Sequence, residues 1–216
     1  MSNKVYNNSM TWKEYLSQPL LRIELIATTI FFIASLSGLA HFLNFVESRN
    51  GIALPDPVLR LFAPVNLTWL TFGLIYFSVF FTLFLNYKKP ARLMFIIQTY
   101  ILVVLIRMAV MYVVPLNPPS GMISLDDPFV QFFGTGQLLT KDLFFSGHTA
   151  LMFLFFLVAE NRKIRSIFLV FTIIVAVSVL LQHVHYTVDV LAAPFFTYAC
   201  FSFVKILRKK IGWEFA

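Results

Sequence analysis

Residues 92–114 read RLMFIIQTYILVVLIRMAVMYVV, a run of 23 residues that is mostly apolar. An α-helix rises about 1.5 Å per residue, so about 20 mostly apolar residues cross the hydrocarbon core of a bilayer. The stretch is long enough to do so, and a single cation, Arg107, interrupts the apolar run from Ile101 to Val114. It therefore predicts a membrane-spanning helix that carries one charged side chain.

The composition extends this prediction to the whole chain. Of its 216 residues, 59% are hydrophobic and 12% are charged, whereas a soluble domain has roughly 45–50% and about 25%. Five further apolar runs lie at 24–45, 65–86, 147–160, 164–182 and 186–206. We predict an all-α, polytopic membrane protein built as a six-transmembrane-helix bundle. The run at 147–160 is short, and its helix is expected to begin a little before Ser146.

The predicted domain organisation is simple. Residues 1–22 form a cytoplasmic leader, residues 23–210 the six-helix membrane domain, and residues 211–216 a cytoplasmic tail. The first apolar run is too long for a signal peptide and is interpreted as an uncleaved span. Thr11 and Glu14 have the spacing of a capping box, which predicts a short interfacial helix in the leader. The single cysteine, Cys200, excludes an intrachain disulfide and a cysteine-rich zinc site.

The basic residues predict the orientation of the bundle. The leader, the second connection, the fourth connection and the tail hold 13 of the 17 Lys and Arg residues. In a six-span topology these four segments share one side, and the opposite side holds Arg49, Arg60 and Lys141. The positive-inside rule therefore predicts that both termini are cytoplasmic. The net charge of +7 is thus a topology signal, and no nucleic-acid partner is expected.

Two polar islands lie where apolar runs begin. Residues 146–149 read SGHT and residues 185–189 read HYTVD. In the predicted topology both islands, together with Arg107, lie near the non-cytoplasmic face. Ionisable residues are expensive at membrane depth and indicate a functional site by default. We therefore expect three distant pieces of sequence to meet there and form a catalytic site.

Each island suggests a chemical role. His185 and Asp189 are four residues apart, which on a helix places them on one side. The carboxylate can then accept a hydrogen bond from one imidazole nitrogen, leaving the other free to attack. The alternative is a polar contact that holds two helices together. His148 follows Gly147 near a helix start, where backbone amides favour an anion, and it can donate a proton to a leaving oxygen.

The remaining polar residues have two interpretations each. The guanidinium fork of Arg107 suits a phosphate, and the alternative is a structural arginine that is ion-paired or reaches the interface. Asp142 either binds a headgroup or is a solvated loop acid. His41 and His183 are interpreted as interfacial or structural.

These residues resemble a known family. Residues 141–149 read KDLFFSGHT and residues 185–190 read HYTVDV, and both segments are similar to those of the sphingomyelin-synthase-related branch (PAP2-like C-terminal type) of the type 2 phosphatidic acid phosphatase superfamily. Arg107 with the proline-rich turn at 115–119 is also similar. The chain departs from the branch at Lys141, where glycine is usual. It departs from the wider superfamily at Val179, where an arginine is usual, and in lacking Lys-x6-Arg-Pro.

The resemblance implies a mechanism without a metal or a cofactor. His185, oriented by Asp189, would attack phosphorus, and His148 would protonate the departing oxygen. The phosphohistidine would then pass its group to an acceptor hydroxyl or to water. The substrate phosphate or headgroup would lie against the residues Arg107, Ser146, Gly147, Asp142 and Tyr186.

Three functions follow as hypotheses. The first is a phosphotransferase that moves a phospho-headgroup between phospholipids or sphingolipids at the face opposite the cytoplasm. The second is a lipid phosphatase with water as acceptor. The third is a non-enzymatic transporter or scaffold. Residues 126–127 (Asp-Asp) and 134–136 (Gly-Thr-Gly) could shape an acceptor pocket and so separate the first two.

Overall fold

The structure is a computed structural model that describes residues 10–125 and 139–212. Within these ranges the chain forms helices and connecting segments and no β-strand, apart from one isolated bridge between Ile52 and Leu116. The elements are α1 (Trp12–Ser17), α2 (Pro19–Ser48), the 3-10 turn η1 (Leu59–Leu61), α3 (Thr68–Asn86), α4 (Pro90–Val113), α6 (Gly147–Val158), α7 (Arg162–Leu181) and α8 (Thr187–Lys210).

The prediction of a polytopic helical membrane protein is confirmed. Five helices, namely α2, α3, α4, α7 and α8, are long and apolar enough to cross a membrane. The helix α6 has only 12 residues, which gives about 18 Å at about 1.5 Å per residue, against a hydrocarbon core of about 30 Å. The predicted run at 147–160 is therefore the one apolar helix among the described residues that falls short of a full span.

Two predicted boundaries were wrong. The helix α6 begins at Gly147, because the hydroxyl of Ser146 caps it by accepting from the backbone N–H of Thr149; it does not begin before Ser146. The helix α2 begins at Pro19, five residues before the predicted start at 24. Proline is favoured in the first helical turn because its missing N–H would have no partner there. The polar residues before the apolar run hid this start.

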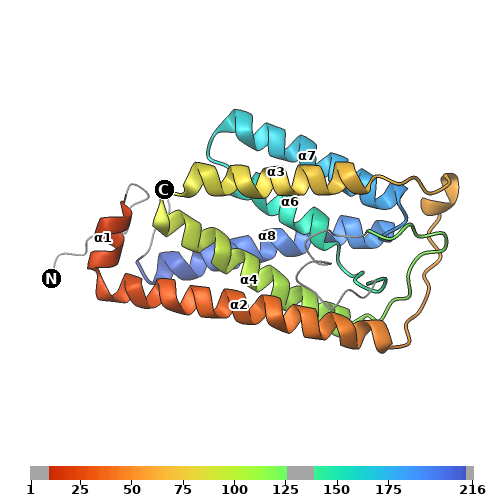
Figure 1. Cartoon of the computed structure of the whole chain (residues 1–216), viewed down its shortest axis with the longest axis horizontal. Helices are drawn as coiled ribbons and strands as arrows, with labels where there is room; N and C mark the ends of the chain where they lie inside the picture. Colours follow the sequence, from red (N-terminus) through yellow and green to blue (C-terminus); the bar gives the residue numbers. More distant parts are fainter. Residues whose placement is uncertain (1–9, 126–138, 213–216) are drawn as a thin grey trace.

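The helices run lengthwise in the bundle, and their connections gather at its two ends (Figure 1). One end, which we call the basic end, holds α1, the α3–α4 and α6–α7 connections and the end of α8. The other, the loop end, holds the segments 49–67, 114–125, 139–146 and 182–186. The four basic segments of the described chain thus share one end, as the predicted alternation requires. Which compartment that end faces stays a prediction.

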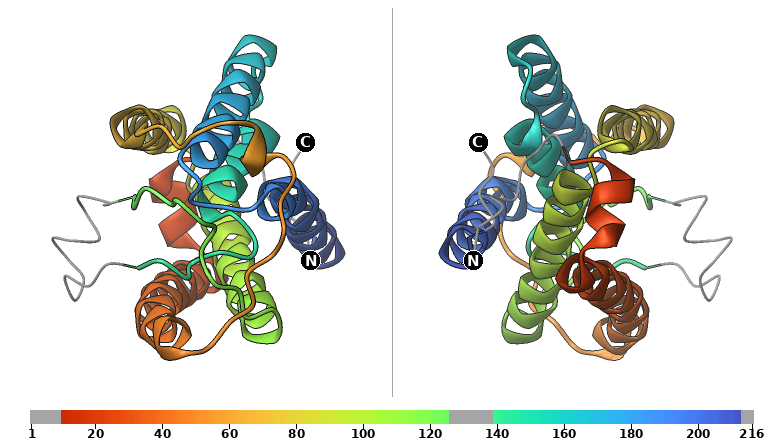
Figure 2. Two further views of the ribbon diagram at one scale, coloured as in Figure 1. Left: turned by 90° about the vertical axis from the view of Figure 1, so that its right-hand side faces the viewer. Right: turned by 90° about the vertical axis from the view of Figure 1, so that its left-hand side faces the viewer.

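The helix α4 lies in the middle of the bundle (Figure 2). It packs against α2, α8, α6 and α3. A separate apolar cluster joins α3, α6 and α7 through buried side chains that include Phe72, Phe155, Phe168, Val175 and Val179. This packing fixes the short helix α6 between its neighbours, so that its first turn lies at the loop end.

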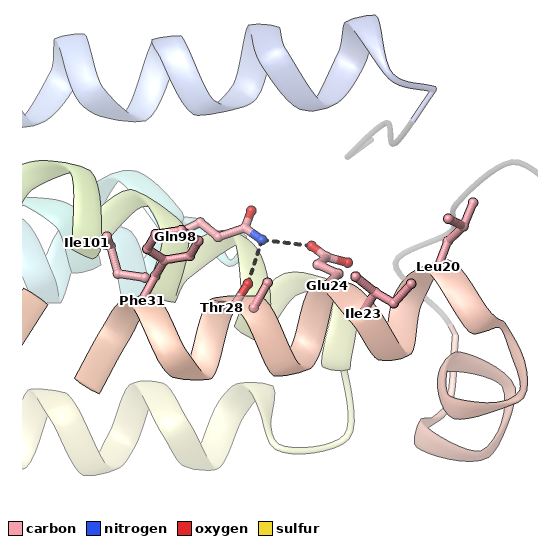
Figure 3. Close-up of a pocket in the computed structure, with 8 residues that line it drawn as sticks. Leu20, Ile23, Glu24, Thr28, Phe31, Gln98 and Ile101 are labelled. Carbon is pink, nitrogen blue, oxygen red and sulfur yellow. Dashed lines mark hydrogen bonds between the residues drawn. The ribbon is translucent and has the colours of Figure 1, made fainter. Parts of the chain in front are cut away.

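The basic end contains a buried polar network (Figure 3). Glu24 of α2 accepts from Arg208 of α8 over 2.7 Å and from Gln98 of α4 over 2.9 Å. The hydroxyl of Tyr15 in α1 donates to the other oxygen of Glu24 over 2.6 Å. The capping box predicted at Thr11 and Glu14 is present at the start of α1. Because Tyr15 is fully buried, α1 is docked on the bundle through this network.

Candidate active site at the loop end

The first turn of α8 brings His185 and Asp189 together. Nδ1 of His185 lies 3.5 Å from Oδ2 of Asp189, and both side chains are fully buried. The two side chains lie close together as predicted, but the reason for their closeness differs from the prediction. Helix α8 begins at Thr187, so His185 precedes the helix. Asp189 folds back to the start of its own helix, where its Oδ2 accepts the backbone N–H of Tyr186 over 3.0 Å.

This separation is longer than a normal hydrogen bond, which joins nitrogen and oxygen at about 2.7–3.2 Å. Among the residues that the structure describes, neither ring nitrogen of His185 has a hydrogen-bond partner. Catalytic hydrogen bonds are often long before substrate binds and tighten in the complex. The pair is therefore close enough for Asp189 to orient the ring.

The first turn of α6 lies directly against the first turn of α8. The backbone N–H of Ser146 donates to the carbonyl oxygen of Asp189 over 3.1 Å. The ring of His148 lies 5.8 Å from that of His185, centroid to centroid, at an interplanar angle of 63°. The two polar islands of the sequence thus form one site.

A cavity of about 190 Å³ opens beside His148. Its wall is drawn from four helices and includes Leu39 of α2, Phe72 of α3, Tyr100 of α4 and Leu151 of α6. Its polar side is formed by Arg107, Asp142, Gly147 and His148. Within the described chain, His185 does not line this cavity and lies behind His148. The cavity therefore combines an apolar wall with a polar side at one end.

Arg107 is held rigidly in that polar side. Its Nε donates to the carbonyl oxygen of Phe145 over 2.7 Å, and its guanidinium pairs with the carboxylate of Asp142 at 2.6 Å. A Cβ atom at Gly147 would lie 3.1 Å from the Cζ of Arg107. The glycine thus lets the guanidinium lie against the start of α6. Arg107 is 5% exposed, and the structure pairs it with Asp142 as the ion-paired interpretation expects.

The other predicted residues fall into two groups. Asp142 and Gly147 line the cavity. Ser146 is fully buried, and its hydroxyl serves the cap of α6. The hydroxyl of Tyr186 accepts from the N–H of Leu54 over 3.1 Å. It donates to the carbonyl oxygen of Asn117 over 2.9 Å. Within the described residues neither Ser146 nor Tyr186 lines the cavity. Each contacts the site through its backbone N–H, which donates to Asp189.

Two further residues at the loop end were missed from the sequence. Asp56, in the α2–α3 connection, accepts the backbone N–H of Thr187 over 2.7 Å. The side chain of Gln182 is fully buried and accepts the N–H of Leu67 over 3.0 Å. Asp56 lies between two prolines in a largely apolar connection, and nothing in that pattern indicates a contact with α8. The position of Gln182 directly after an apolar run is the one sequence signal that could have identified it.

Two groups outside the spans have shifted pKa values. Burial alone would raise the pKa of Asp56, but hydrogen bonds from Thr187, Leu59 and Val58 outweigh it and lower that pKa. Burial raises the pKa of the Tyr186 hydroxyl. Both groups therefore remain in their ordinary charge states at neutral pH, Asp56 as a carboxylate and Tyr186 as a neutral phenol.

His183 takes a different role from the other two histidines. Its backbone has a φ of 56°, and its Nδ1 lies 3.0 Å from the carbonyl oxygen of Ser120. Its ring packs on Phe62 at 5.5 Å. These contacts agree with the structural interpretation. Across residues 10–125 and 139–212, no group of three or more His, Cys, Asp or Glu side chains is arranged to hold a metal ion. The suggested acceptor pocket at 126–127 and 134–136 lies outside the described residues.

Comparison with known proteins supports the family but not the branch. The family model described as PAP2 superfamily C-terminal matches residues 141–206. The match covers α6, α7, both polar islands and most of α8. It supports the PAP2 superfamily and suggests a lipid enzyme of the phosphatase or phosphotransferase type. No curated protein matches the chain.

Proposed function

We propose that the chain is a membrane-embedded phosphotransferase that moves a phospho-headgroup between lipids through a phosphohistidine. The observation that carries the proposal is the pairing of the first turns of α6 and α8, with the His148 ring at the cavity and the His185 ring 5.8 Å from it. Asp189 lies beside His185 at 3.5 Å. A buried histidine with a carboxylate on one nitrogen and no partner on the other is suited to nucleophilic attack.

In the first half-reaction Nε2 of His185 attacks phosphorus, a P–N bond forms, and the P–O bond to the departing oxygen breaks. His148 gives its proton to that oxygen. Asp189 stabilises the positive charge that develops on the His185 ring. Because His185 is fully buried, the phosphoryl group must enter between the two rings, and we expect His148 to move aside when substrate binds.

In the second half-reaction His148 accepts the proton of an acceptor hydroxyl. The acceptor oxygen attacks phosphorus, and the P–N bond to His185 breaks. When the acceptor is a lipid alcohol the product is a new phospholipid or sphingolipid. When it is water the same residues give a lipid phosphatase, which is the alternative. Both functions share the first half-reaction, so His148, His185 and Asp189 do not separate them.

Phosphate binding would fall to Arg107 and the first turn of α6. The first N–H groups of a helix have no acceptor within it and favour an anion. The guanidinium of Arg107 lies against Gly147 in this turn. Asp142 partly neutralises Arg107, so the polar side of the cavity presents both a cation and a carboxylate. Such a side suits a phosphate that carries a cationic headgroup, which is the role proposed for Asp142.

The deciding experiment uses the purified full chain in vesicles. A phospholipid labelled on the phosphate is supplied with a diacylglycerol or a ceramide as acceptor, and the products are separated. Labelled product lipid supports transfer. Labelled water-soluble phosphate alone supports the phosphatase. A wild-type protein that gives neither product, with all substrates at saturation, leaves the third hypothesis of a transporter or scaffold.

Orientation is tested by cysteine accessibility. Cys200 is buried, and a Cys200→Ala background leaves no native thiol. Asn50→Cys at the loop end and Lys88→Cys at the basic end then supply single probes. We expect a membrane-impermeant maleimide added outside intact cells to label Asn50→Cys and not Lys88→Cys. The reverse pattern would place the active site on the cytoplasmic face.

A further inference from the structure

The two residues that follow His185 are both held by the connection between α2 and α3. The hydroxyl of Tyr186 accepts the N–H of Leu54 over 3.1 Å. The N–H of Thr187 donates to Oδ2 of Asp56 over 2.7 Å. Leu54 and Asp56 flank Pro55, so a short, stiff segment of this connection is hydrogen-bonded to the start of α8. His185 is the residue immediately before the two hydrogen-bonded residues.

Asp56 is itself fixed by the turn that follows it. Its Oδ1 accepts the hydroxyl of Thr187 over 3.1 Å. The same oxygen accepts the N–H groups of Val58 over 3.0 Å and Leu59 over 3.3 Å. A carboxylate at a helix N-terminus is favoured both by the unpaired N–H groups there and by the helix dipole. Asp56 therefore acts as a cap of α8 that is supplied from a distant part of the chain.

The first N–H groups of α8 are divided between two carboxylates. Asp189 takes the N–H of Tyr186, and Asp56 takes the N–H of Thr187. Without Asp56, Asp189 is the one carboxylate among the described residues that accepts a hydrogen bond from this turn. It would then be drawn towards a second amide and away from Nδ1 of His185. Because Asp56 accepts the N–H of Thr187, Asp189 has only the N–H of Tyr186 to accept, and its carboxylate stays beside His185.

We propose that Asp56 is a positioning residue, which caps α8 so that Asp189 remains directed at His185. The inference rests on the proposed function, in which the His185–Asp189 pair is the nucleophile. Asp56 lies outside the matched segment 141–206, and it touches neither the cavity nor the two histidines in the described contacts. It acts through Thr187 and Asp189.

The test compares three variants of the full chain in vesicles. Asp56→Ala removes the cap, and Asp56→Asn retains one side-chain oxygen that can accept hydrogen bonds. The matched control is Asn66→Ala. Asn66 lies in the same connection, and its Oδ1 accepts the N–H of Thr68 over 3.1 Å at the start of α3. The control therefore removes a helix cap at the same end of the bundle without touching α8.

Three measurements are made on each variant: steady-state kinetics with the labelled donor, which give kcat and KM; thermal unfolding; and the pH titration of the His185 ring by NMR. The chain has 4 histidines, so the His185 signal is assigned by its loss in a His185→Asn variant. His148 and Asp189 are the titratable groups beside that ring, and both are unchanged in all three variants.

We expect Asp56→Ala to lower kcat about 10-fold or more while KM stays within about twofold, since a misplacement of about 1 Å can cost about 100-fold. The His185 titration should shift to lower pH, because the imidazolium loses its carboxylate. Asp56→Asn should restore part of both. Asn66→Ala should lower the unfolding temperature and leave kcat and the titration unchanged.

The inference is overturned if Asp56→Ala lowers the unfolding temperature but leaves kcat and the His185 titration as in the wild type, because Asp56 is then a structural cap only. If the wild type neither transfers nor hydrolyses, the proposed function fails by itself. In that case the titration still tests whether Asp56 keeps Asp189 directed at His185. A shifted His185 titration in Asp56→Ala supports this role, and an unchanged titration overturns it.

Discussion

The backbone N–H of Ser146 donates to the carbonyl oxygen of Asp189 over 3.1 Å. This single bond joins the residue that caps α6 to the residue that caps α8. It holds the first turns of the two helices side by side, so that His148 and His185 lie close together. Backbone groups, and not the two imidazole side chains, fix this arrangement. Side-chain substitutions in the pair should therefore change chemistry with little effect on the fold.

Substitution of the proposed nucleophile tests this directly. We expect His185→Ala to abolish transfer and hydrolysis alike, and Asp189→Asn to lower kcat by up to about 10⁴-fold, the size of effect known when the orienting carboxylate of a catalytic histidine is replaced. The measurement is product formation per folded protein. His41→Ala is the control, since His41 is exposed near the end of α2. Full activity in His185→Ala would contradict the catalytic interpretation.

A general-acid role for His148 predicts a dependence on the leaving group. General acids contribute about 10²–10⁴-fold when the departing oxygen is a poor leaving group. We therefore expect His148→Ala to lose most of its turnover with an alkyl phosphodiester and to recover the first half-reaction with a p-nitrophenyl ester, which needs no proton. The burst of p-nitrophenolate is the measurement. Equal losses with both substrates would contradict the assignment.

The fold could largely be predicted from the sequence, because the membrane leaves few choices. A run such as 92–114 must be helical to pair its backbone groups in lipid, and the observed α4 spans Pro90–Val113. The meeting of the two islands also followed, since it depends only on the alternation of the spans. Both features follow from the local composition of each apolar run and from the number of spans that separates the two islands.

The finer details of the site depend on contacts that no local pattern encodes. The sequence spacing suggested that His185 and Asp189 share a helix face, whereas Asp189 reaches back as a cap. Asp56 meets Thr187 only because the α2–α3 connection passes over the start of α8. The position of Lys141, where the resembling branch has glycine, is explained likewise: its ammonium donates to the carbonyl oxygens of Glu47 and Arg49 at 3.0 and 2.6 Å. That contact caps α2 and could not be predicted from the motif.

The close approach of Arg107 to Gly147 predicts opposite outcomes for two glycines. Replacing a helical glycine with alanine normally stabilises by about 0.5–1 kcal/mol. At Gly147 the added Cβ would lie 3.1 Å from the Cζ of Arg107, and Arg107 cannot easily move because Phe145 and Asp142 hold it. We therefore expect Gly147→Ala to raise KM and to lower the unfolding temperature.

The control for that experiment is Gly73→Ala in α3, where a Cβ would meet nothing within 4 Å. It should leave KM unchanged and raise the unfolding temperature slightly. The measurements are substrate-saturation curves and thermal unfolding in the same detergent. If both glycine variants behave alike, the guanidinium does not depend on Gly147 for its place.

The buried network at the basic end predicts a stability effect that is separate from catalysis. Arg208 and Glu24 pair at 2.7 Å and are 2% and 7% exposed. Removing one partner of a buried ion pair costs about 3–5 kcal/mol, because the other charge stays buried. We expect Arg208→Met to lower stability by about that amount, and Arg208→Met with Glu24→Gln to recover much of it, as measured by unfolding in detergent.

Two controls accompany that experiment. Lys209→Met changes an exposed cation next in sequence, and it should have little effect on stability. The specific activity of the folded fraction should be unchanged in all of these variants. Glu24 lies near the start of α2 at the basic end, whereas the two histidines lie at the starts of α6 and α8 at the loop end (Figure 1). A loss of kcat in folded Arg208→Met would show that the two ends are coupled.

The lowered pKa of Asp56 predicts how its contribution to stability depends on pH. Burial alone would raise this pKa, but hydrogen bonds from Thr187, Leu59 and Val58 lower it below 3.8, its usual value. A group whose pKa is lower in the folded state stabilises that state above its unfolded pKa and loses the contribution as pH falls through the folded pKa. The stability difference between wild type and Asp56→Asn should therefore be constant above about pH 5 and shrink below about pH 4. The difference between wild type and Asn66→Ala, which involves no ionisable group, should show no such step. A step of equal size in both would mean that the acid transition belongs to other carboxylates and not to the cap of α8.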